Sequence, residues 1–115
     1  MSARSSSGQQ PAGYEVFVVD DDKAMRHSLV HLLEKAGWLV EAFARGEDLI
    51  SRLAEARPDV VLSDVRMPGM SGLDLLRALC GPHAPPMVLI SAHGDVPTAV
   101  QAMQDGAYSF IEKPF

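Results

Sequence analysis

The chain has 115 residues, 47% of them apolar, and a formal net charge of −5 at pH 7. This length and composition predict one domain with a buried core, and the acidic balance argues against a nucleic-acid-binding surface. No apolar run approaches the ~18 residues of a membrane-spanning helix. The single cysteine, Cys80, cannot form an internal disulfide, which favours a reducing compartment and therefore the cytoplasm. Residues 1–13 are rich in Ser, Gly, Gln and Pro without the apolar stretch of a signal peptide, so we expect a disordered tail.

From residue 14 onward the sequence alternates between strand-like and helix-like patterns. Short β-branched and apolar runs predict five strands, at 14–20, 38–43, 60–64, 87–90 and 108–112. Apolar residues at helical spacing predict four helices between them, at 25–36, at 47–56, at 72–79, and between Asp95 and Gly106. Strands that alternate with helices indicate the α/β class, as a three-layer, doubly wound parallel sheet with helices on both faces.

Two of these helices have features that a structure can check. Ser71 is placed to cap the third helix, and Asp95 is a candidate cap of the fourth. Val96, Val100 and Met103 recur at helical spacing, and we expect them to line one face of the fourth helix.

Residues with complementary chemistry follow or end four of the predicted strands: Asp20 and Asp21, Asp64, Ser91, and Lys113. In a parallel sheet these strand ends share one edge, which is where open α/β sheets bind ligands. Crowded carboxylates repel one another, and a divalent cation relieves that repulsion; oxygen ligands with few protein contacts suit Mg²⁺. A hydroxyl and an ammonium suit the stabilisation of a phosphoryl group, and a carboxylate is a known nucleophile for one.

Each of these residues also has an ordinary structural interpretation. Acidic residues before a helix usually cap it, and Asp64 alone could be a turn residue. Ser91 alone would be a loop serine, and Lys113 alone would be a solvated lysine. His27 and His31 lie four residues apart on a helix, but nothing in the sequence completes a metal site around them. Only the joint occurrence of four such strand ends favours a functional site.

Four segments match a known family in order and spacing: V-V-D-D-D-K at 18–23, L-S-D-V-R-M-P-G-M-S-G at 62–72, I-S-A-H-G-D at 90–95 and F-I-E-K-P-F at 110–115. On these segments, residues 14–115 resemble the receiver domain of two-component response regulators. The run at 94–110 is similar to receivers that precede AAA+ enhancer-binding activators or helix-turn-helix DNA-binding domains. The resemblance implies the flavodoxin-like strand order 2-1-3-4-5.

The resemblance also implies a role for each matching residue. Asp64 would be the phosphoryl acceptor, and Asp21, Asp64 and the backbone carbonyl of Arg66 would bind Mg²⁺, with Asp20 acting through metal-bound water. Ser91 and Lys113 would hold the phosphoryl oxygens. Ser91 and Phe110 would form the switch, and the Lys113–Pro114 bond would be cis.

The function implied by the resemblance is that of a phosphoacceptor rather than an enzyme. A sensor histidine kinase would be the donor, and phosphorylation would change the surface around the fourth helix and fifth strand. A C-terminal effector, most simply a transcription regulator, would read that change, and a homodimer is a possible output. The net charge and the lack of a long apolar run predict no contact of this domain with nucleic acid or membrane.

Two alternatives remain open at this point. One is a receiver-like protein-interaction module that no longer takes phosphate, against which the intact set of acids, Ser91 and Lys113 argues. The other is a small phosphatase of the haloacid dehalogenase type, in which Asp20 and Asp22 would be nucleophile and acid. The following Lys23 and Ala24 do not fit the usual continuation of that motif.

The family has a further helix after K-P-F, which is the last segment of this sequence. We therefore expect a receiver domain truncated after its fifth strand, with apolar residues of the sheet left open. The residues expected to be open are among Phe17, Val19, Leu89 and Phe110. Exposed apolar patches of more than a few hundred Å² are rare on soluble monomers, so the isolated piece is expected to be marginally stable or to self-associate.

Overall fold

The computed structural model describes residues 13–92 and 94–113, which form one sheet of five strands with four helices. The strands are β1 (Glu15–Val19), β2 (Leu39–Phe43), β3 (Val60–Asp64), β4 (Met87–Ser91) and β5 (Ser109–Glu112). The helices are α2 (Lys23–Lys35), α3 (Gly46–Leu53), α4 (Gly72–Ala78) and α5 (Val96–Gln104). These elements confirm the predicted alternation of strands and helices, with ends that differ by a few residues.

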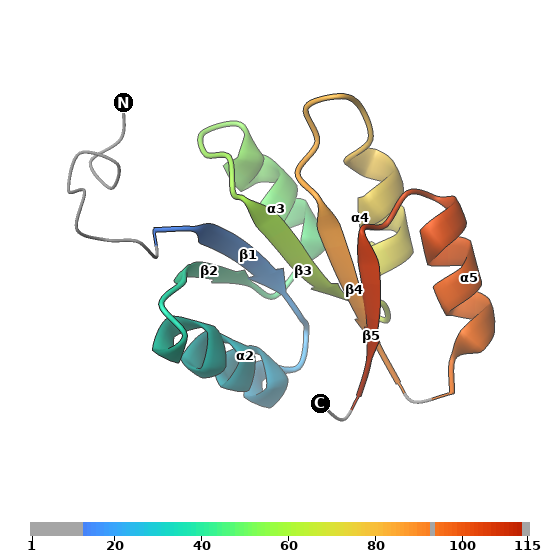
Figure 1. Cartoon of the computed structure of the whole chain (residues 1–115), viewed down its shortest axis with the longest axis horizontal. Coiled ribbons are helices and arrows are strands. Elements are labelled where there is room, and N and C mark those ends of the chain that lie inside the picture. The colour runs from blue at the N-terminus through green and yellow to red at the C-terminus, as the bar shows by residue number, and fades with distance from the viewer. Residues whose placement is uncertain (1–12, 93, 114–115) are drawn as a thin grey trace.

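All neighbouring strands pair in parallel, and their order across the sheet is β2-β1-β3-β4-β5 (Figure 1). This confirms the predicted order 2-1-3-4-5 and the doubly wound class. The strand order reverses between β1 and β3, and open sheets of this kind bind ligands beside such a switch point, at the carboxyl ends of the strands.

The sheet separates the core into two apolar clusters. On one face, Phe17 and Leu89 pack with Leu49 of α3, Leu75 of α4 and Ala102 of α5. On the other face the buried cluster consists of Val16, Val18 and Ile90 of the sheet with Leu29 of α2. Three helices therefore cover one face, and α2 covers part of the other, as Figure 1 shows.

The residues predicted to be open lie on the wrong face. Phe17, Val19 and Leu89 are buried under α3, α4 and α5, and Phe110 packs against the same cluster. The face beside α2 instead carries the alternate residues of each strand, including Ile111, which is paired in register with Ile90 and is 39% exposed. Side chains alternate along a strand, so a shift of one residue exchanges the two faces.

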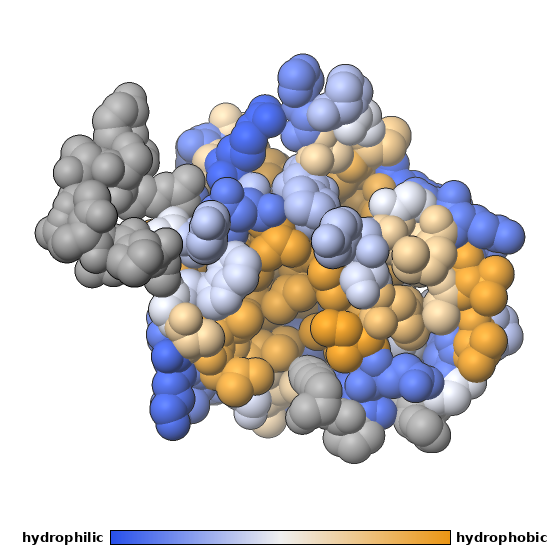
Figure 2. All heavy atoms as spheres, viewed as in Figure 1, coloured by the Kyte–Doolittle hydropathy of each residue, from blue (hydrophilic) through white to orange (hydrophobic). Residues whose placement is uncertain are grey.

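The half-covered face beside α2 is hollowed. A groove of about 420 Å³ runs along the helix and is lined by Asp22, Ala24, Met25, Ser28, Leu29, Leu32 and Lys113. Figure 2 shows hydrophobic residues exposed on this side of the molecule. Over residues 13–92 and 94–113, no helix combines the length and hydropathy needed to cross a bilayer.

Local capping explains where two helices begin. Asp22 caps α2 by accepting hydrogen bonds from the backbone N–H groups of Ala24 at 2.9 Å and Met25 at 3.3 Å. The predicted Ser71 cap of α4 is confirmed as a reciprocal capping box with Asp74.

α5 departs from expectation at its N-cap, and its apolar stripe is exposed. Asp95 occupies the N-cap position, but its side chain makes no capping hydrogen bond. Val96, Val100 and Met103 are half or more exposed, so their stripe does not pack on the sheet, and Ala102 is the helix residue that is buried.

Candidate functional site

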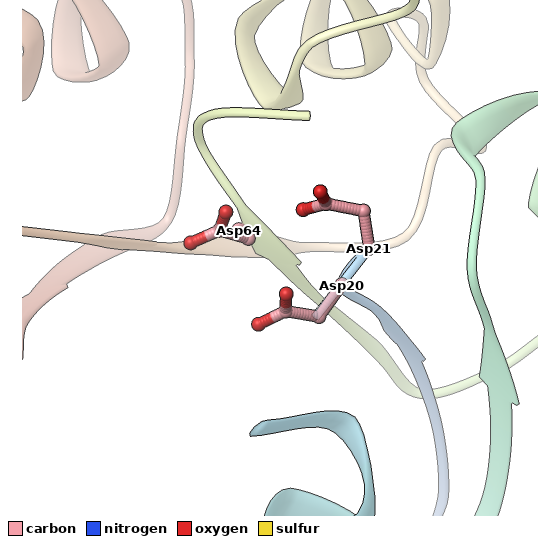
Figure 3. Close-up of side chains that lie close together, drawn as sticks. All are labelled: Asp20, Asp21 and Asp64. Carbon is pink, nitrogen blue, oxygen red and sulfur yellow. The ribbon is translucent and has the colours of Figure 1, made fainter. Parts of the chain in front are cut away.

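Three carboxylates meet at the carboxyl edge of the sheet. Asp20 and Asp21 directly follow β1, and Asp64 is the last residue of β3. One carboxylate oxygen from each lies within 4.8 Å of the others, and Figure 3 shows the three side chains close together at these strand ends. Asp20 and Asp64 are buried, whereas Asp21 is exposed. The adjacency predicted from the strand ends is therefore present in the structure.

Asp20 is a carboxylate with one satisfied and one unsatisfied oxygen. Its Oδ1 accepts a hydrogen bond from the backbone N–H of Asp22 at 2.9 Å, while Oδ2 is buried with no hydrogen-bond partner among residues 13–92 and 94–113. The guanidinium of Arg26 donates to the backbone carbonyl of Asp20 at 2.7 Å and fixes this strand end. Burial raises the pKa of Asp20 above its ordinary value; the Asp22 hydrogen bond opposes that rise, and the charge of Asp64 adds to it.

Lys113 supplies the positive charge of the site. Its Nζ lies 3.1 Å from Oδ1 of Asp64, and only 29% of its side chain and 10% of the Asp64 side chain are exposed. An ion pair this sheltered is screened less than a surface pair. The backbone N–H of Lys113 donates to the carbonyl of Ser91 at 2.7 Å, which aligns the ends of β4 and β5.

Ser91, the other residue predicted to hold a phosphoryl group, is buried at the end of β4 but does not donate to Asp64. Its hydroxyl donates to Oδ2 of Asp95 at 3.0 Å. The same oxygen lies 3.6 Å from a guanidinium nitrogen of Arg66. Hydrogen bonding by the Thr98 side chain is the largest influence that holds the pKa of Asp95 below its ordinary value. The hydrogen bond from Ser91 and the charge of Arg66 act in the same direction.

Gly72 fixes the backbone of the acceptor strand. Its N–H donates to the carbonyl of Val65 at 2.8 Å, so the start of α4 is held against the residues that follow β3. A Cβ at this position would lie 2.4 Å from the backbone carbonyl oxygen of Asp64 and 2.9 Å from Cα of Val65. Only glycine permits this approach, and Gly72 therefore positions the end of β3.

The remaining predicted residues lie around this cluster. Arg66 is in the loop after Asp64 with an exposed side chain, and the metal contact of its carbonyl stays a prediction. Phe110 is partly buried against the cluster beneath α3, α4 and α5, and its switching role also stays a prediction. The Lys113–Pro114 bond, predicted to be cis, lies outside the described residues.

The residues present fit a hard divalent cation such as Mg²⁺. They offer oxygen ligands only, they bring negative charge that a cation would neutralise, and they include the buried and unpartnered Oδ2 of Asp20. The geometry fits the paired Asp20 and Asp22 of a phosphatase less well, because the Asp22 carboxylate is already occupied as the cap of α2.

Sequence reasoning did not identify two residues of this region. Asp95 was interpreted as a helix cap, although an acid four residues after a strand-end serine could have been recognised as a partner for its hydroxyl. Gly72 was interpreted only as the start of a helix. Its contact with Asp64 depends on how closely α4 approaches β3, which no local pattern reports.

The fold and this acidic edge are those of a receiver domain, and comparison with known proteins agrees. The chain belongs to the response regulator receiver domain family, whose model matches residues 16–115. It is 46% identical over 105 residues to the C4-dicarboxylate transport transcriptional regulatory protein DctD of Rhizobium meliloti (strain 1021), covering 90% of this chain and 23% of DctD. It is 45% identical over 101 residues to the transcriptional regulatory protein FixJ of Bradyrhizobium diazoefficiens, covering 87% of this chain and 49% of FixJ.

The solved structure of FixJ-N has the same fold. It superposes with a TM-score of 0.83 and 43% sequence identity, and the match covers 89% of this chain and 82% of FixJ-N. The matched region thus covers less than a quarter of DctD and about half of FixJ.

Proposed function

We propose that the chain accepts a phosphoryl group on Asp64, donated by the phosphohistidine of a sensor histidine kinase. The observation that carries this proposal is the position of Asp64: a buried carboxylate on a strand end, 3.1 Å from the Lys113 ammonium and grouped with Asp20 and Asp21. A carboxylate held on a rigid strand end is placed for in-line attack, since phosphoryl transfer depends mainly on positioning and charge stabilisation.

Mg²⁺ is the proposed cofactor. Asp21, Asp64 and the backbone carbonyl of Arg66 would bind it directly, and Asp20 would contact it through water. The unpartnered Oδ2 of Asp20 and the crowding of three carboxylates support this assignment. When bound, Mg²⁺ supplies positive charge that neutralises the acids and the phosphoryl oxygens.

Lys113 and Ser91 are the proposed phosphoryl-binding residues, and Ser91 and Phe110 the proposed switch. Lys113 is already at the acceptor, while Ser91 donates to Asp95 and would have to turn toward a phosphoryl group on Asp64. Movement of Ser91 with its loop would open space for Phe110 to turn inward. The surface of α5 and β5 would change as a result.

The proposed role is that of a signalling switch and not of an enzyme with turnover. DctD and FixJ are transcriptional regulatory proteins that extend well beyond the matched region. We propose by analogy that a C-terminal effector regulates transcription and that the protein acts in the cytoplasm. This domain itself would contact neither nucleic acid nor membrane, and two receiver domains would pair on activation. The net charge of −5 supports the absence of a nucleic-acid contact.

The domain is proposed to begin near residue 14 and to need one more helix, supplied by chain beyond Phe115, over the groove beside α2. The apolar side chains of Met25, Leu29 and Leu32 in that groove and the exposed Ile111 support this. A version lengthened by about 15 residues of the natural sequence, one helix of ordinary length, should melt at a higher temperature than residues 1–115 and stay monomeric in ultracentrifugation. Equal melting temperatures would contradict the proposed helix.

Intact-mass spectrometry after treatment with acetyl phosphate tests the function. We expect one phosphoryl group per chain with Mg²⁺, none with EDTA, and none on Asp64→Asn. Asp59→Asn at the opposite end of β3 is the matched control and should be labelled as the wild type. Catalytic turnover of a phosphate ester that Asp20→Asn abolishes would instead favour a phosphatase.

A further inference from the structure

The hydroxyl of Ser91 is committed to a single acceptor. Ser91 is 2% exposed, and its Oγ donates at 3.0 Å to Oδ2 of Asp95, whose side chain is itself only 15% exposed. A serine hydroxyl carries one proton and can donate one hydrogen bond at a time. While Asp95 accepts that proton, Ser91 cannot donate to any group on Asp64.

This hydrogen bond also links two elements. Ser91 ends β4 and Asp95 immediately precedes α5, so the contact ties the start of that helix to the edge of the sheet. The charge of Arg66, 3.6 Å from the same Oδ2, favours the ionised acceptor. A second contact holds the intervening loop independently, because the backbone N–H of Gly94 donates to Oε2 of Glu112 at 2.8 Å.

A phosphoryl group on Asp64 would compete with Asp95 for the same proton. It brings three strong acceptor oxygens and a charge of about −1.5 to −2. We propose that Asp95 is a positioning residue that holds the Ser91 hydroxyl in the unphosphorylated state, and that phosphorylation frees the start of α5 by drawing this donor away. The inference rests on the proposed function, since it requires Asp64 to carry the phosphoryl group.

The proposal has a thermodynamic consequence that can be measured. A contact made only in the unphosphorylated state stabilises that state and so weakens the binding of anything that requires the other one. Removal of Asp95 should therefore tighten the binding of a phosphoryl analogue. A merely structural role for Asp95 would instead leave that binding unchanged or weaken it.

Calorimetric titration with beryllium fluoride in the presence of Mg²⁺ tests this, because the analogue occupies the place of a phosphoryl group on a carboxylate. We expect Asp95→Ala to bind it about tenfold more tightly than the wild type, the scale of a lost hydrogen bond to a charged acceptor. Asp95→Asn keeps an uncharged acceptor and should lie between the two. In a Ser91→Ala background, the Asp95→Ala change should leave the affinity for beryllium fluoride unchanged, because the hydroxyl proton for which the two acceptors compete is absent.

Glu112→Ala is the matched control, because it releases the same loop at Gly94 without touching the Ser91 hydroxyl, and it should bind the analogue as the wild type does. The proposal is overturned if Asp95→Ala and Asp95→Asn bind no more tightly than the wild type. It is equally overturned if Glu112→Ala gives the same gain or if the gain persists without Ser91. Failure of the wild type to bind the analogue would be a different result, which removes the proposed function together with this inference.

Discussion

Aspartates lie at both ends of the strands, in contrasting surroundings. At the amino end of β3, Oδ2 of Asp59 accepts a hydrogen bond from the backbone N–H of Glu15 at 2.7 Å, and the Asp59 N–H donates to the Glu15 carbonyl at 2.8 Å. At the carboxyl end, Asp20 and Asp64 are buried beside Asp21, and one oxygen of Asp20 has no hydrogen-bond partner in the part of the chain that the structure describes.

This difference in hydrogen bonding distinguishes an acid that stabilises the fold from acids that are placed to bind a ligand. Asp59 joins the starts of β1 and β3 and is satisfied by the chain itself. The carboxyl-edge acids are crowded and incompletely satisfied, which is unfavourable unless a further positive group binds between them. Three crowded carboxylates, of which Lys113 neutralises only part, are a physical indication of function.

The largest expected effect comes from removing the cation of the carboxyl edge. Lys113→Ala should lower the rate of labelling of Asp64 by acetyl phosphate about 100-fold, the scale on which preorganised charge stabilises a transition state. The measurement is a time course of intact mass.

Arg57→Ala is the control at the amino edge. Arg57 donates to the backbone carbonyl of His83 at 3.2 Å, away from the acidic cluster, and its loss should leave the labelling rate unchanged. Equal rates for Lys113→Ala and the wild type would contradict the role of Lys113.

The next effect concerns metal affinity. Asp21→Asn should weaken Mg²⁺ binding about thirtyfold and Asp20→Asn about tenfold, because a direct ligand matters more than one that acts through water. Isothermal calorimetry measures both, with Asp59→Asn as a control that should not change the affinity. Equal losses, or a larger loss for Asp20→Asn, would count against this division of roles.

Gly72→Ala tests how closely the fold holds the acceptor. Its Cβ would lie 2.4 Å from the Asp64 carbonyl oxygen, so backbone must move, and we expect a loss of about 2 kcal/mol in the free energy of unfolding. Urea denaturation measures it.

Gly46→Ala is the matched control, since its Cβ would meet the flexible side chain of Met70 at 3.1 Å. It should cost less than Gly72→Ala, because a methionine can move aside where backbone cannot. A Gly72→Ala variant as stable as Gly46→Ala would show that α4 does not constrain Asp64.

The smallest effects are expected to have opposite signs at the two edges. In EDTA at neutral pH, Asp20→Asn should raise the free energy of unfolding by about 1 kcal/mol, because it removes a buried and incompletely paired charge. Asp59→Asn should lower it by about 1 kcal/mol, because it weakens a satisfied hydrogen bond. Urea denaturation that gave the same sign for both would contradict the contrast between the edges.

The pH dependence follows from the raised pKa of Asp20. Its folded-state pKa lies above the unfolded value, so the folded chain holds the proton more tightly and loses stability as pH rises from about 3.8 through the folded pKa. Asp20→Asn should lack this part of the pH profile in EDTA. Identical profiles for the variant and the wild type would show that Asp20 does not titrate in this way.

Much of this organisation could be predicted from the sequence. The alternation of strands and helices fixed the class, and the acids, the serine and the lysine at strand ends could be placed on one edge because parallel strands end together. Lys113 and Asp64 are 49 positions apart in the sequence, yet the alternation of strands and helices placed them on the same edge, and their side chains lie 3.1 Å apart.

The orientation of the strands could not be predicted. A strand of a parallel sheet is apolar on both faces, so β1, with buried Val16 and Val18 on one side and Phe17 and Val19 on the other, gives no alternation to read. The wrong face was therefore expected to be open. The exposed stripe of α5 has a related cause, because spacing shows that Val96, Val100 and Met103 share a face but not what that face contacts.

The central claim, that Asp64 is the acceptor among several adjacent acids, is tested most directly by locating the phosphoryl group. Borohydride reduces an acyl phosphate to an alcohol, which would convert a labelled aspartate to homoserine in the peptide. After treatment with acetyl phosphate and Mg²⁺, peptide mass spectrometry should find homoserine at position 64 and unmodified aspartate at positions 20, 21 and 22. Homoserine at any of those three positions with aspartate intact at 64, or no modified peptide at all, would contradict the account.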